Sequence, residues 1–172
     1  KQARQAIRKA KREQPEKQII VTGCAAQINP EKWLEMAEVD HVIGNHEKLL
    51  QDSWQRLKTN QLSDMEVTDI SEITETAAHM IDSFEEHTRG FLQIQQGCNH
   101  RCSFCIIPYG RGPSRSIAAG QVVESVRALC ANGTKEVVLS GIDLTSWGQD
   151  LPGNPKLGWL VLQVLKEVPE LP

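Results

Sequence analysis

Three cysteines within eight residues constrain this chain more than any other feature of its sequence. Cys98, Cys102 and Cys105 are separated by three and by two residues. They follow residues 91–95, where apolar and polar side chains alternate as they do in a β-strand. A compact loop at the end of a strand would therefore present three thiolates to a single metal centre.

The spacing alone leaves more than one metal open. Thiolates are soft ligands, which favours an iron–sulfur cluster or zinc, and three cysteines would leave one iron of a [4Fe–4S] cluster free for a substrate. The alternatives are a zinc site completed by His100 or by a distant ligand such as Cys24, and three unrelated buried thiols. The short tether of His100 disfavours the zinc site, and the polar neighbours of the cysteines disfavour buried thiols. We therefore predict an iron–sulfur cluster.

The remaining cysteines agree with metal chemistry rather than disulfide bonding. The count of five is odd, and the chain shows no secretory features. Cys130 lies on the apolar face of a predicted helix, where a free cysteine behaves as a small hydrophobic residue. We assign Cys130 to the core.

The first third of the chain predicts a parallel α/β sheet. Short β-branched strands at residues 18–22 and 41–44 alternate with helices, which are predicted at 1–14, from Pro30 and at 47–57. Cys24 would lie on the loop that leaves the first strand at its carboxyl end, where open sheets bind ligands.

The two later helices of this region have predicted apolar faces. We expect six side chains in the core: Trp33, Leu34, Ala37, Leu50, Trp54 and Leu57.

From residue 90 the pattern predicts the repeating unit of a (β/α) barrel. Strands at 91–95 and 136–140 alternate with a helix capped by Ser116 and a helix at 157–168. Two such units fit within the chain.

Charge divides the sequence into three parts. Residues 59–89 hold eight acidic residues and one basic residue, although the net charge of the whole chain is only −3. We predict a domain at 1–58, an acidic connector with some strand content at 59–89, and a second domain at 90–172. The chain begins with Lys1 rather than Met, so we expect a piece of a longer protein.

Basic residues surround the cysteine motif. Arg101, Arg111 and Arg115 lie in a stretch without any acid between residues 91 and 123, and Tyr109 is interleaved with them. Such a loop could accept an anionic ligand that carries a base. The alternative is that the arginines offset the charge of a thiolate-ligated cluster.

A second basic group lies on the first predicted helix. Lys1, Arg4, Arg8 and Arg12 fall on one helical stripe. A solvated helix face is the simpler interpretation, and a stripe that faces phosphate groups is the alternative.

Residues 97–112, 21–27 and 139–148 resemble motifs of the radical S-adenosylmethionine (SAM) methylthiotransferases. The resemblance implies a truncated N-terminal methylthiotransferase domain followed by the first units of a radical SAM partial barrel. The residues after Gly23 and Ser140 are most similar to the branch that acts on threonylcarbamoyladenosine beside the tRNA anticodon. The other branches act on isopentenyladenosine in tRNA and on a ribosomal-protein aspartate. A zinc-stabilised RNA-binding module is the alternative from another class.

The family resemblance implies two [4Fe–4S] clusters. Cys98, Cys102 and Cys105 would hold the radical-generating cluster, whose open iron binds SAM. Cleavage of SAM would give a radical that takes hydrogen from C2 of the adenine, where sulfur and then a methyl group are installed. Cys24 would be one of three ligands of an auxiliary cluster.

The family resemblance also implies further contacts. We expect Tyr109, Ser140 and Gly141 to contact SAM. We expect RNA contacts from three arginines: Arg101, Arg111 and Arg115.

The implied partners are the tRNA anticodon stem-loop, SAM, a sulfur donor and an electron donor, all in the cytoplasm. No apolar run approaches the roughly 20 residues that span a membrane. The other auxiliary cysteines, the later barrel strands and an RNA-binding domain would lie outside this chain. We therefore expect the chain alone to be inactive.

Overall fold

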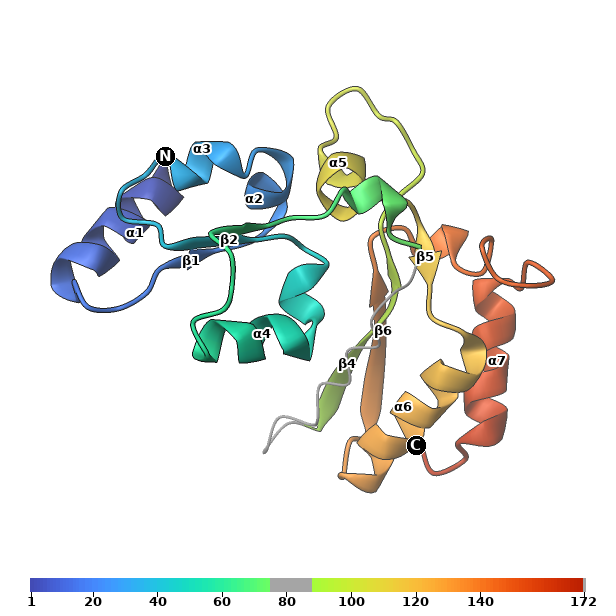
Figure 1. The fold of residues 1–172 in the computed structure, drawn as a ribbon. Coiled ribbons are helices and arrows are strands. Elements are labelled where there is room, and N and C mark those ends of the chain that lie inside the picture. Colours follow the sequence, from blue (N-terminus) through green and yellow to red (C-terminus); the bar gives the residue numbers. More distant parts are fainter. Residues whose placement is uncertain (75–87, 172) are drawn as a thin grey trace. The chain divides into compact units, whose positions relative to one another are not determined.

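The computed structural model describes residues 1–74 and 88–171 and divides into two compact units. The first unit consists of Lys1–Ile73 with Cys102–Gly112, and the second of Thr74–Arg101 with Pro113–Pro172. Within the described residues, each unit contains one three-stranded sheet with helices beside it (Figure 1). The predicted α/β class is confirmed.

The first unit alternates short helices and strands. In chain order its elements are α1 (Gln2–Glu13), β1 (Ile20–Val21), α2 (Cys24–Ile28), α3 (Glu31–Leu34), β2 (His41–Ile43), a 3-10 turn (Glu47–Leu49), α4 (Gln51–Lys58), β3 (Met65–Glu66), a second 3-10 turn (Ile70–Glu72) and α5 (Ile107–Arg111). The strands are parallel in the order β1–β2–β3, with Val21 opposite Val42 and Val42 opposite Met65. The predicted parallel sheet is therefore present.

A small apolar core holds the first unit together. Five buried side chains form it: Val21, Ala26, Met36, Val39 and Val42. Ile7 of α1 and Trp33 and Leu34 of α3 pack against this cluster. These contacts confirm the prediction for Trp33 and Leu34.

Three core predictions in the first unit are wrong, and the cause is where the helices end. The helix α3 stops at Leu34, so helical spacing no longer applies at Ala37, which is exposed, while Met36 is buried. The predicted helix at 47–57 is interrupted at Leu50, whose φ of −86° and ψ of 125° are extended.

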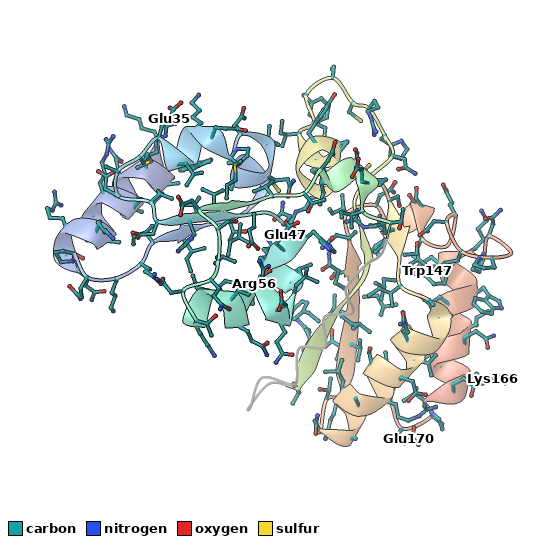
Figure 2. The ribbon with its side chains drawn as sticks, viewed as in Figure 1. Glu35, Glu47, Arg56, Trp147, Lys166 and Glu170 are labelled. Atoms are coloured by element: carbon teal, nitrogen blue, oxygen red, sulfur yellow. The ribbon has the colours of Figure 1, made fainter. Side chains whose placement is uncertain are left out.

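This break changes which face of α4 points inward. Leu50 and Trp54 are 39% and 37% exposed, whereas Ser53 is fully buried. The Nε1 of Trp54 donates to the carbonyl of Lys48 at 2.8 Å. Arg56 forms a two-pronged ion pair with Glu66 of β3 and so ties α4 to the edge of the sheet; Figure 2 labels Arg56 on α4.

Cys24 is the first residue of α2 rather than a loop residue. The chain turns from β1 into α2 at Gly23, whose φ of +108° favours glycine. The thiol is nevertheless placed just after the carboxyl end of β1, as predicted.

The second unit contains the longer strands. Its described elements are β4 (Arg89–Gln96), β5 (Arg115–Ser116), α6 (Ala119–Ala131), β6 (Glu136–Gly141), a 3-10 turn (Leu144–Ser146) and α7 (Leu157–Glu167). β4 and β6 are parallel, with Phe91 opposite Val138, while β5 pairs antiparallel with the other edge of β4. The β4–α6–β6–α7 order matches the two predicted units.

Helices α6 and α7 lie side by side in Figure 1 and bury a larger core against the sheet. The buried residues include Ile94, Val122, Val126, Trp147 and Leu160. Trp147, labelled in Figure 2, is fully buried, and its Nε1 donates to the carbonyl of Ile117 at 3.1 Å. Cys130 packs against this core, and burial raises the pKa of its thiol.

Ser116 does not cap α6. It lies in β5, opposite Gln95, and its Oγ accepts a hydrogen bond from the amide of Gly148 at 2.8 Å. The helix begins three residues later, with Ala118 at its N-cap. The extra antiparallel strand explains the difference, because it takes up the residues that the sequence pattern assigned to the cap.

The first unit continues past residue 58, because β3 pairs with β2 and extends the sheet. Part of the predicted acidic connector, residues 75–87, lies outside the described residues. Among the helices that the structure does describe, none combines the length and the apolar character needed to cross a membrane.

Candidate functional site

The loop that carries Cys98 begins where β4 ends in the second unit. Gly97 makes the turn with a φ of +73°. The side chain of Gln95, fully buried in β4, donates through Nε2 to the carbonyl of Gly97 at 2.8 Å and to Ser114 Oγ at 2.9 Å. Its Oε1 accepts from the amide of Asp143 at 2.8 Å. One buried amide therefore holds both the Cys98 loop and the loop that follows β6.

Residues of the loop also hold its shape from within. The Nη1 of Arg101 donates to the carbonyls of Cys98, Asn99 and His100 at 3.2–3.4 Å. The side chain of Asn99 accepts from the amide of Ser114 at 2.9 Å. Arg101 thus organises the backbone around Cys98 while its side chain stays exposed.

His100 lies beside Asp143, with 3.1 Å between Nε2 and a carboxylate oxygen. Hydrogen bonds from Ser146 and Thr145 lower the pKa of Asp143, against the opposing effect of burial. The sulfur of Cys98, a ring nitrogen of His100 and an oxygen of Asp143 lie within 4.8 Å of one another. This group is a mixed set of possible metal ligands that sequence spacing did not reveal.

Cys102 and Cys105 belong to the first unit. The amide of Cys105 donates to the carbonyl of Cys102 at 3.0 Å, which closes a turn between the two thiols. Apolar side chains around them are unusually open to solvent: Phe104 is 90%, Ile106 56% and Tyr109 61% exposed. Exposed aromatic and aliphatic side chains clustered on a short segment indicate a surface that binds a ligand or partner.

Helix α5, which follows Cys105, packs directly on Cys24. A Cβ added at Gly110 would lie 2.6 Å from the Cβ of Cys24, so the two backbones approach closely because residue 110 is glycine. Asn45, 5% exposed, donates through Nδ2 to the carbonyl of Gly110 at 2.5 Å and to the sulfur of Cys24 at 3.7 Å. Lys48 in turn donates to Asn45 Oδ1 at 2.7 Å, and burial lowers the pKa of Lys48.

The arginines near the motif differ in their environments. Arg111 is partly buried in α5, whereas Arg101 is exposed. Arg115 is only 4% exposed and donates to Gln96 Oε1 at 3.0 Å, and burial lowers its pKa. Because its guanidinium is enclosed, we leave Arg115 out of the expected RNA contacts.

Ser140 and Gly141 end β6 and are partly buried. The hydroxyl of Ser140 donates to the carbonyl of Leu92 at 3.4 Å. A Cβ at Gly141 would lie 2.9 Å from Leu144 and 3.0 Å from Gln95, so this backbone also packs against the buried amide.

Comparison with known proteins places the cysteine motif in a family. A model of the Radical SAM superfamily matches residues 92–152. The chain is 53% identical over 171 residues to the threonylcarbamoyladenosine tRNA methylthiotransferase MtaB of Rickettsia prowazekii (strain Madrid E), covering 99% of this chain and 40% of that relative. The chain belongs to the radical SAM methylthiotransferase family.

Two further relatives show how the similarity spreads within this family. The Aquifex aeolicus (strain VF5) protein of the same name is 38% identical over 149 residues, covering 86% of this chain and 36% of that relative. The ribosomal protein uS12 methylthiotransferase RimO of Anaeromyxobacter sp. (strain K) is 37% identical over 157 residues, covering 91% of this chain and 33% of that relative. The chain spans 40% or less of the length of these curated relatives.

The donor set fits the iron–sulfur chemistry of this family. All five cysteines are free thiols, and Cys98, Cys102 and Cys105 are exposed or only partly buried, so they are available to a metal. These three residues lie within the matched region, as do Ser140 and Gly141. Cys24 lies outside it.

Sequence analysis missed the residues that position these cysteines. Gln95 had a detectable signal, because Gln95 and Gln96 are consecutive polar residues that break the alternation of a strand just before Gly97 and Cys98. Asn45 and Asp143 had no comparable signal, because each is a polar residue in a loop and its partners are distant in sequence.

Proposed function

We propose that this chain is part of an enzyme that methylthiolates tRNA at C2 of N6-threonylcarbamoyladenosine, next to the anticodon. The observation that carries the proposal is the 53% identity, along nearly the whole chain, to a relative named for that activity. The free thiols of the cysteine motif and the exposed aromatic side chains beside them support it.

In this proposal, Cys98, Cys102 and Cys105 hold a [4Fe–4S] cluster and Cys24 is a ligand of a second, auxiliary cluster. When bound, the first cluster supplies the electron that cleaves SAM into methionine and a 5′-deoxyadenosyl radical. Gln95 and Arg101 fix the backbone around Cys98 before SAM binds, which limits the cost of ordering the loop.

Other residues of the chain would orient SAM and RNA. Ser140 and Gly141, at the carboxyl end of β6, offer backbone groups to the amino end of SAM. Tyr109 offers an exposed ring against which an adenine can stack. Arg101 and Arg111 supply positive charge for phosphate groups. The enzyme would draw on separate sulfur and electron donors in the cytoplasm.

The direct test is mass spectrometry of tRNA nucleosides from cells with and without the gene that encodes this chain. We expect the methylthio form of threonylcarbamoyladenosine to disappear on deletion and to return with the intact gene. A gene with Cys102→Ala should fail to restore it, whereas Cys130→Ala should succeed because Cys130 packs in the core. Unchanged nucleosides after deletion would contradict the proposal.

The second candidate is methylthiolation of a ribosomal protein, which the 37% identity to RimO favours. The same strains separate the two candidates. Loss of mass from a ribosomal protein, with tRNA nucleosides unchanged, would select this second function.

A further inference from the structure

The first unit contains a basic groove where α1, α2 and α3 meet the residue before α5. The groove has a volume of about 320 Å³, and Arg4, Ala25, Asn29, Lys32, Trp33 and Ile106 line it. Among the residues that the structure describes, its lining includes two cations and no acidic side chain. This volume lies at the lower end of the range for small-ligand pockets and suits a single nucleotide.

The cations of the groove are not neutralised by carboxylates. Across the described chain, neither Arg4 nor Lys32 has an ion-pair partner, whereas Arg8 pairs with Glu38 and Lys11 with Asp40. The helix α1 therefore keeps an unpaired guanidinium at the groove, while two of its neighbouring cations are occupied. An anion would gain most from contact with the unpaired side chains.

A flat surface accompanies this charge. The guanidinium carbon of Arg4 lies 5.7 Å from the ring centroid of Trp33, a cation–π arrangement. Nucleobases stack on aromatic rings and on arginine planes, and Lys32 can contact the neighbouring phosphate as a point charge. This combination of flat surfaces and cations favours single-stranded nucleic acid over an acidic peptide, which would not use the stacking surface.

The groove adjoins residues next to two of the cysteines. Ala25 follows Cys24 and Ile106 follows Cys105, and both neighbours line it. A nucleotide held here would lie beside the segments that carry these cysteines within the first unit.

We propose that this groove binds one nucleotide of single-stranded RNA, with its base stacked on Arg4 and Trp33 and its phosphate on Lys32. The proposal rests on the proposed function, because it gives the tRNA substrate a contact on this unit. It assigns a role to Arg4 that is separate from the three arginines near the cysteine motif.

The experiment measures binding of this chain to a fluorescein-labelled anticodon stem-loop RNA by fluorescence anisotropy. The double variant Arg4→Gln, Lys32→Gln should bind about tenfold more weakly, and its log–log salt dependence should flatten by about 1.4 for two lost phosphate contacts. The matched control is Arg12→Gln, because Arg12 is an exposed cation two turns further along α1. This control should change the affinity less than twofold.

Failure of this proposal can be told apart from failure of the proposed function. Equal weakening by Arg12→Gln would assign RNA binding to the helix stripe, and unchanged binding by the folded double variant would exclude the groove. Absence of RNA binding by the wild-type chain would also overturn the proposal. Each of these results leaves the nucleoside measurement in cells unaffected. Far-ultraviolet circular dichroism of each variant checks that its fold is retained.

Discussion

The two units both use a buried amide side chain next to a cysteine, but in different ways. In the second unit, Gln95 bonds to backbone groups and a hydroxyl, and so fixes the loop on which Cys98 lies. In the first unit, Asn45 reaches the sulfur of Cys24 itself as well as the carbonyl of Gly110. The comparison shows that a cysteine motif records the ligands, whereas the groups that place them come from elsewhere in the chain.

The apolar cores of the units differ in the same direction. The second unit has the larger buried cluster, while the first has a small one and relies on ion pairs and on the close approach of α5 to α2. We therefore expect truncation of core side chains to cost more in the second unit, and steric changes at the helix contact to matter most in the first.

Loss of the largest buried side chain should have the greatest effect. Trp147→Ala removes a fully buried ring and its hydrogen bond, and should lower the free energy of unfolding by about 4 kcal/mol. Trp54→Ala, at a position 37% exposed, should cost less than about 1 kcal/mol. Urea denaturation followed by circular dichroism measures both, and equal losses would remove the contrast between the units.

An added methyl group at the α2–α5 contact should come next. Gly110→Ala places a Cβ 2.6 Å from that of Cys24, against backbone that cannot move aside cheaply, and should cost about 2–3 kcal/mol. Gly120→Ala on α6 is the matched control, because no heavy atom lies within 4 Å of its added Cβ. This control should stabilise the chain by about 0.5–1 kcal/mol. A neutral Gly110→Ala in the same denaturation series would show that the helices do not pack so closely.

The buried amide of the second unit should have a smaller effect. Gln95→Leu leaves the amide of Asp143 and the carbonyl of Gly97 without this partner and should cost about 2 kcal/mol. Gln93→Leu, two residues earlier on the same strand, removes one weak bond of 3.4 Å and should cost well under 1 kcal/mol. If the two variants unfold at the same urea concentration, Gln95 does not hold the two loops together.

The smallest effect concerns an ion pair of the first unit. Burial opposes ionisation of Asp40, but hydrogen bonds from the amide of Ile19 at 2.7 Å and from Lys11 at 3.0 Å lower its pKa. The carboxylate therefore adds stability above its ordinary pKa, and this stability is lost as the pH falls through the lowered folded-state value. Asp40→Asn should lose less than about 1 kcal/mol at pH 7, since the pair is partly exposed, and should show a flatter loss of stability in acid. Thermal melting between pH 7 and pH 3 checks this, and parallel curves for variant and wild type would contradict it.

The sequence predicted the elements better than it predicted their faces. Alternation and β-branched runs located β1, β2, β4 and β6, because strand periodicity is a local property. Trp54 was misplaced because the extended residue Leu50 restarts the helix and turns Ser53 inward, which no periodicity of the predicted 47–57 helix contains. Ser116 was misplaced because a two-residue strand pairs with β4, and such pairing depends on residues distant in sequence.

The candidate site shows the same limit. The spacing of the cysteines indicated metal chemistry because it is itself a local pattern. The burial of Arg115 and the contact of Asn45 with Cys24 could not be read in this way, since each depends on tertiary packing.

Anaerobic reconstitution of this chain with iron and sulfide tests the central claim most directly. We predict a brown protein that absorbs at about 400 nm, with the absorption lost in Cys102→Ala and retained in Cys130→Ala. A colourless chain that binds one zinc ion, with loss of that zinc in Cys98→Ala or His100→Ala, would contradict the account and assign the metal to the group formed with Asp143.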